Sequence, residues 1–380
     1  MRQHASKVAL AAIVLAAGLM TAAGAQETIK IGVIQPLTGA FAASGNYVAN
    51  GAKIAADEIN AKGGVLGKKL ELVIEDGQCK PAESVGAAEK LIFRDKVSAL
   101  MGAFCSGATL AVMPVAQKNK IPLVTGVSSN PKLTEMGNEW FFRNAETEAL
   151  TAQAFARVLA KDMKLNNAFF LAVNDDWGRG TVEAFKANWD KAGGKTAGIE
   201  FVDRTANDFY TPLTKIRSTR PDVVIVAAES QAGSIIAKQA KELGLQARIF
   251  GVGAWATPTF MELAGDAANG LLAGVVYAPT QPGERNKSFV ATYKAAYNEE
   301  PGKYSAAGYN TINILAQAIQ RAGSADPEKI RAALEKTDYS GPNGHVRFDE
   351  KHQAYGHELV LVELQNKVPH VKATSVIQKP

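Results

Sequence analysis

Histidine is scarce in this chain and lies almost entirely near its C-terminus. Five histidines occur in 380 residues, and four of them follow residue 340: His345, His352, His357 and His370. None has the HExxH or HxH spacing by which two imidazoles reach one metal ion. We interpret them as surface or hydrogen-bonded side chains, and we expect no metal site.

A large excess of charge of either sign is also missing. The chain has 42 lysines and arginines against 37 acidic residues, mixed along stretches such as 238–242. Nucleic acids and anionic membranes attract a basic stripe, which this sequence lacks. We therefore expect no nucleic-acid partner. A hydrophobic content of 47% with 21% charged residues is typical of a globular chain, and the length favours two domains.

Long hydrophobic runs are absent except at residues 8–23. Arg2 and Lys7 precede this run, and Ala23-Gly24-Ala25 follows it with the A-x-A pattern of a cleavage site. We predict a signal peptide at 1–25 and a mature periplasmic protein that begins at Gln26. An uncleaved anchor is the alternative, but the run is shorter than the roughly 20 residues that span a bilayer. Glutamine in place of cysteine at position 26 argues against lipid attachment.

Only two cysteines occur, Cys79 and Cys105. An isolated pair in an exported protein most simply forms one disulfide. A redox pair or a metal site is the alternative. The absence of CxxC spacing, and of histidine between residues 7 and 342, disfavours both.

Short β-branched runs alternate with amphipathic stretches along the chain, which is typical of βαβ units and a parallel sheet. The expected strands are 29–34, 70–75, 98–101, 122–125, 168–173, 196–202, 222–227, 247–250 and 271–276. The expected helices are 48–61, 83–94, 107–119, 146–161, 177–192, 211–218, 233–243, 286–297, 304–322 and 327–336. The segments 345–348, 358–364 and 370–377 read as a β-rich tail that is too short for a core of its own.

The pattern predicts an α/β protein with two doubly wound lobes. We assign 26–143 with 280–343 to lobe 1, and 144–279 with 344–380 to lobe 2. The expected crossings between lobes, near 143–145, 277–283 and 340–344, are short and allow only hinge bending. Ligands of open α/β sheets bind outside the carboxyl ends of the strands. The cleft between the lobes is therefore the expected binding site.

The segments that come near to catalytic or cofactor-binding motifs do not match them fully. Residues 63–69 have the wrong glycine spacing for a phosphate loop, and 251–256 matches a loose GxGxxA but lacks the acidic residue about 20 positions later. Ser106 follows a strand as in hydrolases, but Phe104 replaces the first glycine of GxSxG. We expect no enzyme and no cofactor. Instead, a helix that starts at Ser106 would point free N–H groups into the cleft, which suits a carboxylate.

Several motifs together resemble one known family. They are Ile29-Lys30-Ile31-Gly32 with Pro36-Leu37-Thr38-Gly39, Gly51-Ala52, Ile59-Asn60-Ala61-Lys62-Gly63-Gly64, Gly67-Lys68-Lys69-Leu70, Asp76 with Cys79-Lys80-Pro81, Cys105-Ser106 and Ile121-Pro122. The mature chain resembles the periplasmic solute-binding proteins of branched-chain amino-acid ABC importers. The resemblance implies the type I periplasmic-binding fold with a three-strand hinge, a membrane permease as partner, and a Cys79–Cys105 disulfide. We expect a monomer.

The resemblance also implies binding residues. Ser106 and Gly107 fall where the family grips a ligand carboxylate, and Val127, Ser128 and Ser129 where backbone groups and a hydroxyl add to that grip. Trp177 stands where the family usually has a tyrosine that lines the second lobe.

The expected ligand class stays open at this point. Glu229 follows a strand at a position that faces the cleft and favours a cationic group on the ligand, because a buried carboxylate is costly unless paired. The family's ammonium-binding acid is replaced here by Gly253. Trp255 and Tyr304, with Trp177, would also suit an aromatic acid, an amide or urea. A sensory ligand-binding protein remains an alternative to a transport receptor.

Overall fold

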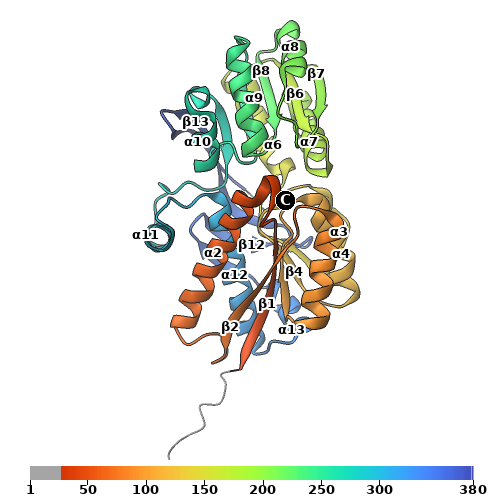
Figure 1. The fold of residues 1–380 in the computed structure, drawn as a ribbon, viewed down its shortest axis with the longest axis vertical. Helices are drawn as coiled ribbons and strands as arrows, with labels where there is room; N and C mark the ends of the chain where they lie inside the picture. The colour runs from red at the N-terminus through yellow and green to blue at the C-terminus, as the bar shows by residue number, and fades with distance from the viewer. Residues whose placement is uncertain (1–26, 378, 380) are drawn as a thin grey trace, which may run out of the picture.

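The computed structural model describes residues 27–377 and 379, so the expected signal peptide lies outside the described residues. Two α/β lobes are stacked along the long axis of the molecule (Figure 1). None of the helices in the described part of the chain combines the length and apolar character needed to cross a membrane.

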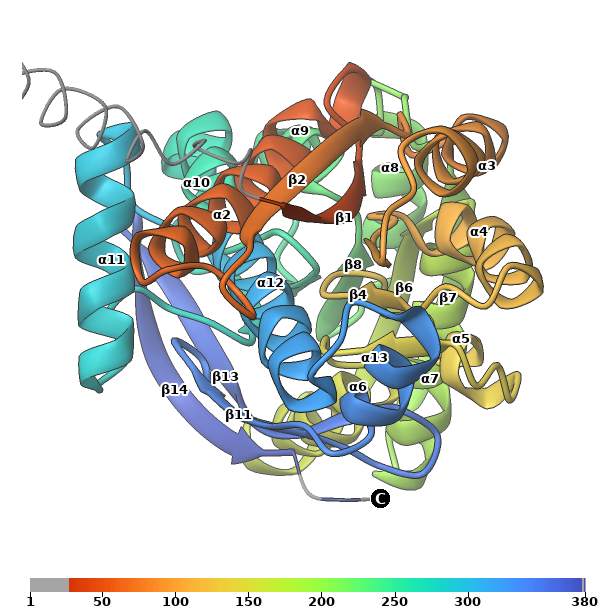
Figure 2. The ribbon, with the colours of Figure 1, turned by 90° about the horizontal axis from the view of Figure 1, so that it is seen from below.

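The first lobe is built on a parallel sheet with the strand order β2-β1-β3-β4-β5. Helices α2 and α12 pack together on one face of it, and α3 and α4 on the other (Figure 2). The strands are β1 (Thr28–Gln35), β2 (Lys69–Asp76), β3 (Ala99–Met101), β4 (Leu123–Thr125) and β5 (Phe141–Arg143). The helices are η2 (Gly39–Phe41), α2 (Ala42–Ala61), α3 (Pro81–Glu89), η3 (Lys90–Arg94), α4 (Ser106–Lys118), α5 (Lys132–Glu135), α11 (Glu284–Tyr297), α12 (Lys303–Ala322) and α13 (Pro327–Leu334).

The second lobe has parallel strands in the order β7-β6-β8-β9-β10. Every residue of the central strand β8, Val-Val-Ile-Val-Ala, is buried, as expected for a strand covered on both faces. The strands are β6 (Asn167–Val173), β7 (Lys195–Val202), β8 (Val223–Ala227), β9 (Arg248–Val252) and β10 (Leu272–Val275). The helices are α6 (Glu148–Arg157), η4 (Val158–Asp162), α7 (Asp176–Lys191), α8 (Tyr210–Thr219), α9 (Ser230–Glu242), α10 (Pro258–Ala264) and η5 (Gly265–Ala268).

The β-rich tail connects the two lobes, as the sequence predicts. It comprises β11 (Asp338–Gly341), β12 (Gly344–Phe348), β13 (Ala354–Gln365) and β14 (Val368–Val376). The start of β13 pairs with β12, and its later part pairs with β10 and β14. One long strand is therefore shared between the lobes.

The hydrophobic cores show where the chain crosses. One core contains residues up to Phe142 and again from Tyr304 to Ala354, together with Ala254 from the second lobe. The other runs from Ala152 to Val276 and from Leu359 onward. The third crossing therefore lies within β13, after the expected 340–344, because the hairpin β11–β12 packs Val346 and Phe348 into the first core. We propose these core limits as the lobe boundaries.

A disulfide joins Cys79 to Cys105, two residues separated by 26 positions. We predict that the double variant Cys79→Ser/Cys105→Ser loses about 3 to 4 kcal/mol of unfolding free energy, because the cross-link restricts the unfolded chain. Urea unfolding of the parent, with and without reductant, measures this loss. Equal stability of variant and oxidised parent would contradict the prediction, and the reduced parent, which should match the variant, is the control.

Candidate functional site

A small cavity lies between the lobes at the carboxyl ends of both sheets. Loops after β3 and β4 supply its wall from the first lobe, and loops after β6, β7, β8 and β9 supply its wall from the second. The lining residues are Phe104, Cys105, Ser106, Val127, Ser128, Ser129, Glu148, Trp177, Arg204, Glu229, Gly253, Lys303 and Tyr304. Its volume is about 20 Å³, enough for about one water molecule. The lobes are thus closed upon each other.

The structure brings most of the sequence-predicted site residues together. Eight of them line the cavity: Ser106, Val127, Ser128, Ser129, Trp177, Glu229, Gly253 and Tyr304. Gly107 lies at the lobe interface beside the cavity, where a Cβ atom would come within 2.7 Å of Asp176 Oδ2.

Trp255 lies elsewhere. Its side chain is buried in the core of the second lobe, packs on Phe260 and donates a hydrogen bond from Nε1 to the Ala228 carbonyl at 2.8 Å. The chain turns at Gly253, which has a φ of +98°, so that the indole two residues later folds back over Gly251. The aromatic wall of the cavity therefore consists of Phe104, Trp177 and Tyr304.

Ser106 offers the free hydroxyl donor of the first lobe. It is the first residue of α4, whose leading N–H groups have no partner within the helix. Its Oγ accepts from the backbone N–H of Asn130 at 3.3 Å, and its hydroxyl hydrogen has no acceptor among the described residues. Ser128 donates to the Ala103 carbonyl and Ser129 to Glu148, so both are already engaged. The start of α4 can thus hold an anion.

Glu148 is a functional candidate that sequence reasoning missed. Ser129 Oγ from the first lobe and Trp177 Nε1 from the second donate to its Oε1 at 2.6 and 2.7 Å. Its Oε2 is buried and has no partner among the described residues. Burial raises the pKa of this carboxyl to about 7. The available signal was an acid in the first helical turn after the expected crossing at 143–145.

The negative charge of Glu229 has more partners within the protein than that of Glu148. Its Oε2 accepts from the Tyr304 hydroxyl at 2.9 Å. Burial raises the pKa of Glu229, while the nearby cations Lys303 and Arg204 act in the opposite direction. Neither cation had been identified from the sequence.

The ion pairs of those two cations leave the cleft with an excess of negative charge. Arg204 pairs with Asp175, and Lys303 Nζ lies 4.0 Å from Glu146 Oε1. Two cations therefore stand against four carboxylates when Glu148 and Glu229 are ionised. A positively charged group in the cleft would offset this imbalance.

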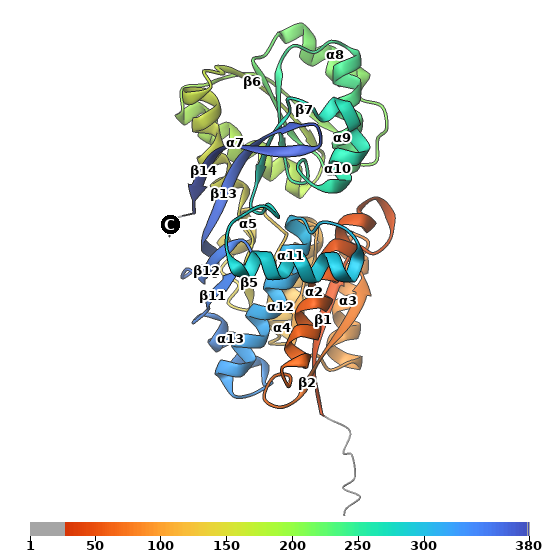
Figure 3. The same cartoon turned by 90° about the vertical axis from the view of Figure 1, so that its left-hand side faces the viewer.

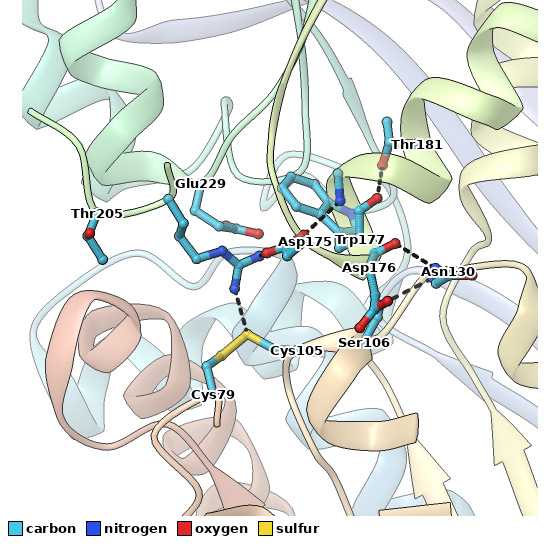
Figure 4. Close-up of polar contacts among 12 residues, drawn as sticks. Cys79, Cys105, Ser106, Asn130, Asp175, Asp176, Trp177, Thr181, Thr205 and Glu229 are labelled. Carbon is cyan, nitrogen blue, oxygen red and sulfur yellow. Dashed lines mark hydrogen bonds and ion pairs between the residues drawn. A yellow bond between two sulfur atoms is a disulfide. The ribbon is translucent and has the colours of Figure 1, made fainter. Parts of the chain in front are cut away.

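Polar contacts span the closed cleft. Asn130 Nδ2 donates to the Asp176 carbonyl at 2.6 Å, and Arg204 Nη1 contacts Cys105 Sγ at 3.2 Å (Figure 4). The Arg204 guanidinium also lies 4.6 Å from the ring centre of Phe41 in the first lobe. Arg204 therefore reaches across from the second lobe and occupies part of the cleft.

Arg143 fixes the loop that carries the serines. It is fully buried at the end of β5, and burial lowers the pKa of its guanidinium to about 9. It donates to the Asn130 carbonyl at 2.6 Å, to Thr134 Oγ1 at 2.7 Å and to Gln353 Oε1 at 2.6 Å. One side chain thus joins the binding loop to the segment that leads into β13.

The raised pKa of Glu148 predicts that this residue lowers the stability of the folded protein by an amount that depends on pH. A carboxyl with a higher pKa in the folded state holds its proton longer there than in the unfolded chain, so stability falls as pH rises from the unfolded value through about 7. We compare the unfolding free energy of Glu148→Gln with that of the unliganded parent. The difference should shift in favour of the variant by about 3 kcal/mol as the pH rises from 4.5 to 8. Urea unfolding at several pH values measures this. Glu284→Gln, at an exposed glutamate of α11, is the control for loss of charge. If the difference in unfolding free energy between Glu148→Gln and the parent stays constant with pH, the prediction is contradicted.

Comparison with known proteins places the fold and site in context. A family model described as periplasmic binding protein matches residues 28–369. The Leu/Ile/Val-binding protein BraC3 of Rhizobium johnstonii is 32% identical over 84% of this chain and 87% of its own length. The crystal structure of the leucine binding protein LivK from Thermotoga maritima is 31% identical, covers 91% of this chain and 98% of its own, and has a TM-score of 0.86.

Another structural relative carries a different kind of ligand. A solute binding protein of an ABC transporter from Rhodopseudomonas palustris, crystallised with 3,4-dihydroxybenzoic acid, is 25% identical, with a TM-score of 0.85 over 93% of this chain and 98% of its own. These relatives are solute-binding proteins, which supports the expectation of a non-enzyme. The two-lobed parallel α/β fold predicted from the sequence is confirmed, and the chain belongs to the periplasmic binding protein family.

Proposed function

We propose that this protein is the extracytoplasmic receptor of an ABC importer and that it captures a small α-amino acid between its lobes. Support comes from membership of the periplasmic binding protein family and from relatives named for leucine, isoleucine and valine binding. The three crossings between the lobes allow hinge closure over a solute. The closed form is then presented to a membrane permease in the periplasm, and no bond is made or broken.

The observation that carries the ligand class is the unpaired Oε2 of Glu148. A buried carboxylate oxygen without a partner is costly, and a ligand ammonium would supply the missing charge and hydrogen bond. Ser106 and the start of α4 offer donors for a carboxylate in the same cavity. One anion site and one cation site next to each other match the charges of the zwitterionic head of an amino acid. The lobes would have to part slightly to admit it, because the closed cavity of about 20 Å³ holds about one water molecule.

An aromatic acid is the second candidate. Phe104, Trp177 and Tyr304 line the cavity, and the relative from Rhodopseudomonas palustris binds a hydroxylated benzoic acid. A carboxylate without an ammonium, however, would add a further negative charge beside Glu148 and Glu229. The charge balance of the cleft therefore favours the amino acid.

We predict that one or more amino acids raise the melting temperature of the protein, because a ligand held between the lobes stabilises only the folded state. At 100 times the dissociation constant the gain is about 2.7 kcal/mol. A thermal-shift screen over amino acids, benzoic acids, amides and urea measures it. If no compound in this panel shifts the melting temperature, the receptor proposal fails.

The second prediction separates the two acids of the cleft. Glu148→Gln should weaken amino-acid binding by about 3 to 5 kcal/mol, the usual cost of breaking a buried ion pair. Glu229→Gln should cost less, since Tyr304 and the nearby cations already compensate this group. Ser106→Ala should cost about 1 to 3 kcal/mol. Isothermal calorimetry of each variant with the ligand found in the screen measures these differences.

Proton release provides an independent readout for Glu148. Its pKa of about 7 leaves it partly protonated near neutral pH, and an ammonium favours the ionised form. Binding to the parent should therefore release protons and tighten from pH 6 to pH 8, whereas Glu148→Gln should show neither effect. The aromatic acid replaces the amino acid as the candidate ligand under one outcome. In that outcome Glu148→Gln binds a benzoic acid with the affinity of the parent, and Trp177→Ala no longer binds it.

A further inference from the structure

The three crossings between the lobes enclose a second small polar cavity, which we call the hinge cavity. Residues 144–146 of the first crossing, Val276 of the second and His357 of the third line it, together with residues of α12 and of the loop after β4. Its volume is about 20 Å³, enough for about one water molecule. The third crossing is carried by β13, which runs from the hairpin β11–β12 of the first lobe into the second lobe (Figure 3).

His357 lies in the middle of this third crossing. The first core ends at Ala354 and the second resumes at Leu359, so His357 belongs to the short stretch between them. Its side chain is only 1% exposed. The preceding residue, Gly356, has a φ of +101°, which favours glycine. A change in the angle between the lobes therefore moves the backbone next to this imidazole.

Neither ring nitrogen of His357 has a hydrogen-bond partner among the described residues. A neutral imidazole has one donor and one acceptor, and one water molecule in the hinge cavity can bind to it. The side-chain oxygens of Asn343 and Asn144 in the lining already accept from Asn310 at 2.6 Å and from Thr311 at 3.2 Å. An imidazolium has two donors and a charge to satisfy. The closed hinge therefore suits the neutral ring better than the charged one.

The charges that line the hinge cavity do not favour a further cation. Glu146 and Lys303 are its two charged residues, with Lys303 Nζ 4.0 Å from Glu146 Oε1, so each offsets the other. Tyr304, the remaining titratable residue besides His357, donates its hydroxyl to an acid of the cleft. Burial lowers the pKa of His357, while Glu146 acts in the opposite direction. A proton on His357 would make two cations share one carboxylate.

The charged residues on the strands beside His357 do not line the hinge cavity. Glu358, the next residue of β13, is exposed. His345 of β12 pairs with an aspartate of β11 at 2.8 Å, and Lys379 pairs with a glutamate that precedes β13 at 2.6 Å. The charge balance of the hinge cavity therefore depends on the two charged residues of its lining and on His357 itself.

We propose that the hinge is a proton-sensitive switch, in which neutral His357 keeps the unliganded lobes closed and protonated His357 drives them apart. Opening admits water to the hinge cavity, and water can then solvate the imidazolium. A proton on Glu148 acts in the opposite direction, because it removes a buried charge from the closed cleft. The switch lies at the crossings and does not depend on which solute the protein binds.

The test compares the pKa of His357 in closed and wedged protein, by NMR of the histidine side chains of the full mature chain. Every protein carries Glu148→Gln, which removes the opposing group. Gly107→Trp is the wedge, because a Cβ atom there would already lie 2.7 Å from Asp176 Oδ2 of the other lobe. The pKa of His357 should be lower by at least ~1 in the unwedged protein, equivalent to a tenfold change in the ratio of closed to open molecules. His357→Gln assigns the signal, and the exposed His370, with one pKa in both proteins, is the internal control.

Small-angle X-ray scattering checks the two states. The unwedged protein should be more compact than the wedged one at pH 8 and should expand as the pH falls to 5, whereas His357→Gln should stay compact. Gly180→Trp, where a Cβ atom would lie 2.8 Å from Asn130 Nδ2, wedges the cleft from the second lobe if Gly107→Trp does not fold. An equal pKa of His357 in wedged and unwedged protein would overturn the inference. The same holds for an unwedged protein that is as expanded as the wedged one at pH 8, that does not expand at pH 5, or that still expands without His357.

Discussion

The buried guanidinium of Arg143 is the constraint on which the cleft depends. It stands at the end of β5, immediately before the first crossing, and holds the carbonyl of Asn130 and the side chain of Gln353 at once. The backbone of residue 143 also bridges to 353, so the first and third crossings lie side by side. A planar group with five donors can satisfy several acceptors in a dry environment, which a lysine cannot do with the same geometry. The loop that carries the site serines and the hinge therefore share one anchor.

The opposition of two parallel sheets explains the chemistry of the cleft. Carboxyl ends of both sheets face each other, so loops from six strands and the start of α4 meet in one small volume. Low local dielectric raises the cost of any unpaired charge there. Glu148 is the clearest case, since it is contacted from both lobes and still has one oxygen free.

Two cavities of different character lie next to each other, a polar one between the lobes and a larger apolar one that shares Gly253 and Lys303 with it. The polar cavity is lined by serines and acids of the cleft, and the charged groups at the apolar one are paired with each other or with neighbouring residues. Lys303 lies at the junction, where its ammonium faces Glu146 and the ring of Tyr304. Because the crossing after β10 forms part of the apolar wall, an occupant would contact the hinge as well as both lobes.

Sequence alone determined the alternation of strands and helices, since β-branched runs such as Val223–Ala227 and amphipathic stretches such as Lys303–Ala322 carry their own periodicity. It also indicated Ser106 and Glu229, which lie in loops that follow strands, and the family resemblance indicated Ser129. It missed β5 and α10, which are too short to show a period, and it placed Trp255 in the cleft. Only the tertiary structure brought Glu148, Arg204 and Lys303 together. These side chains come from the start of α6, from the loop after β7 and from the start of the distant helix α12. Their meeting depends on how the lobes close, which no local pattern encodes.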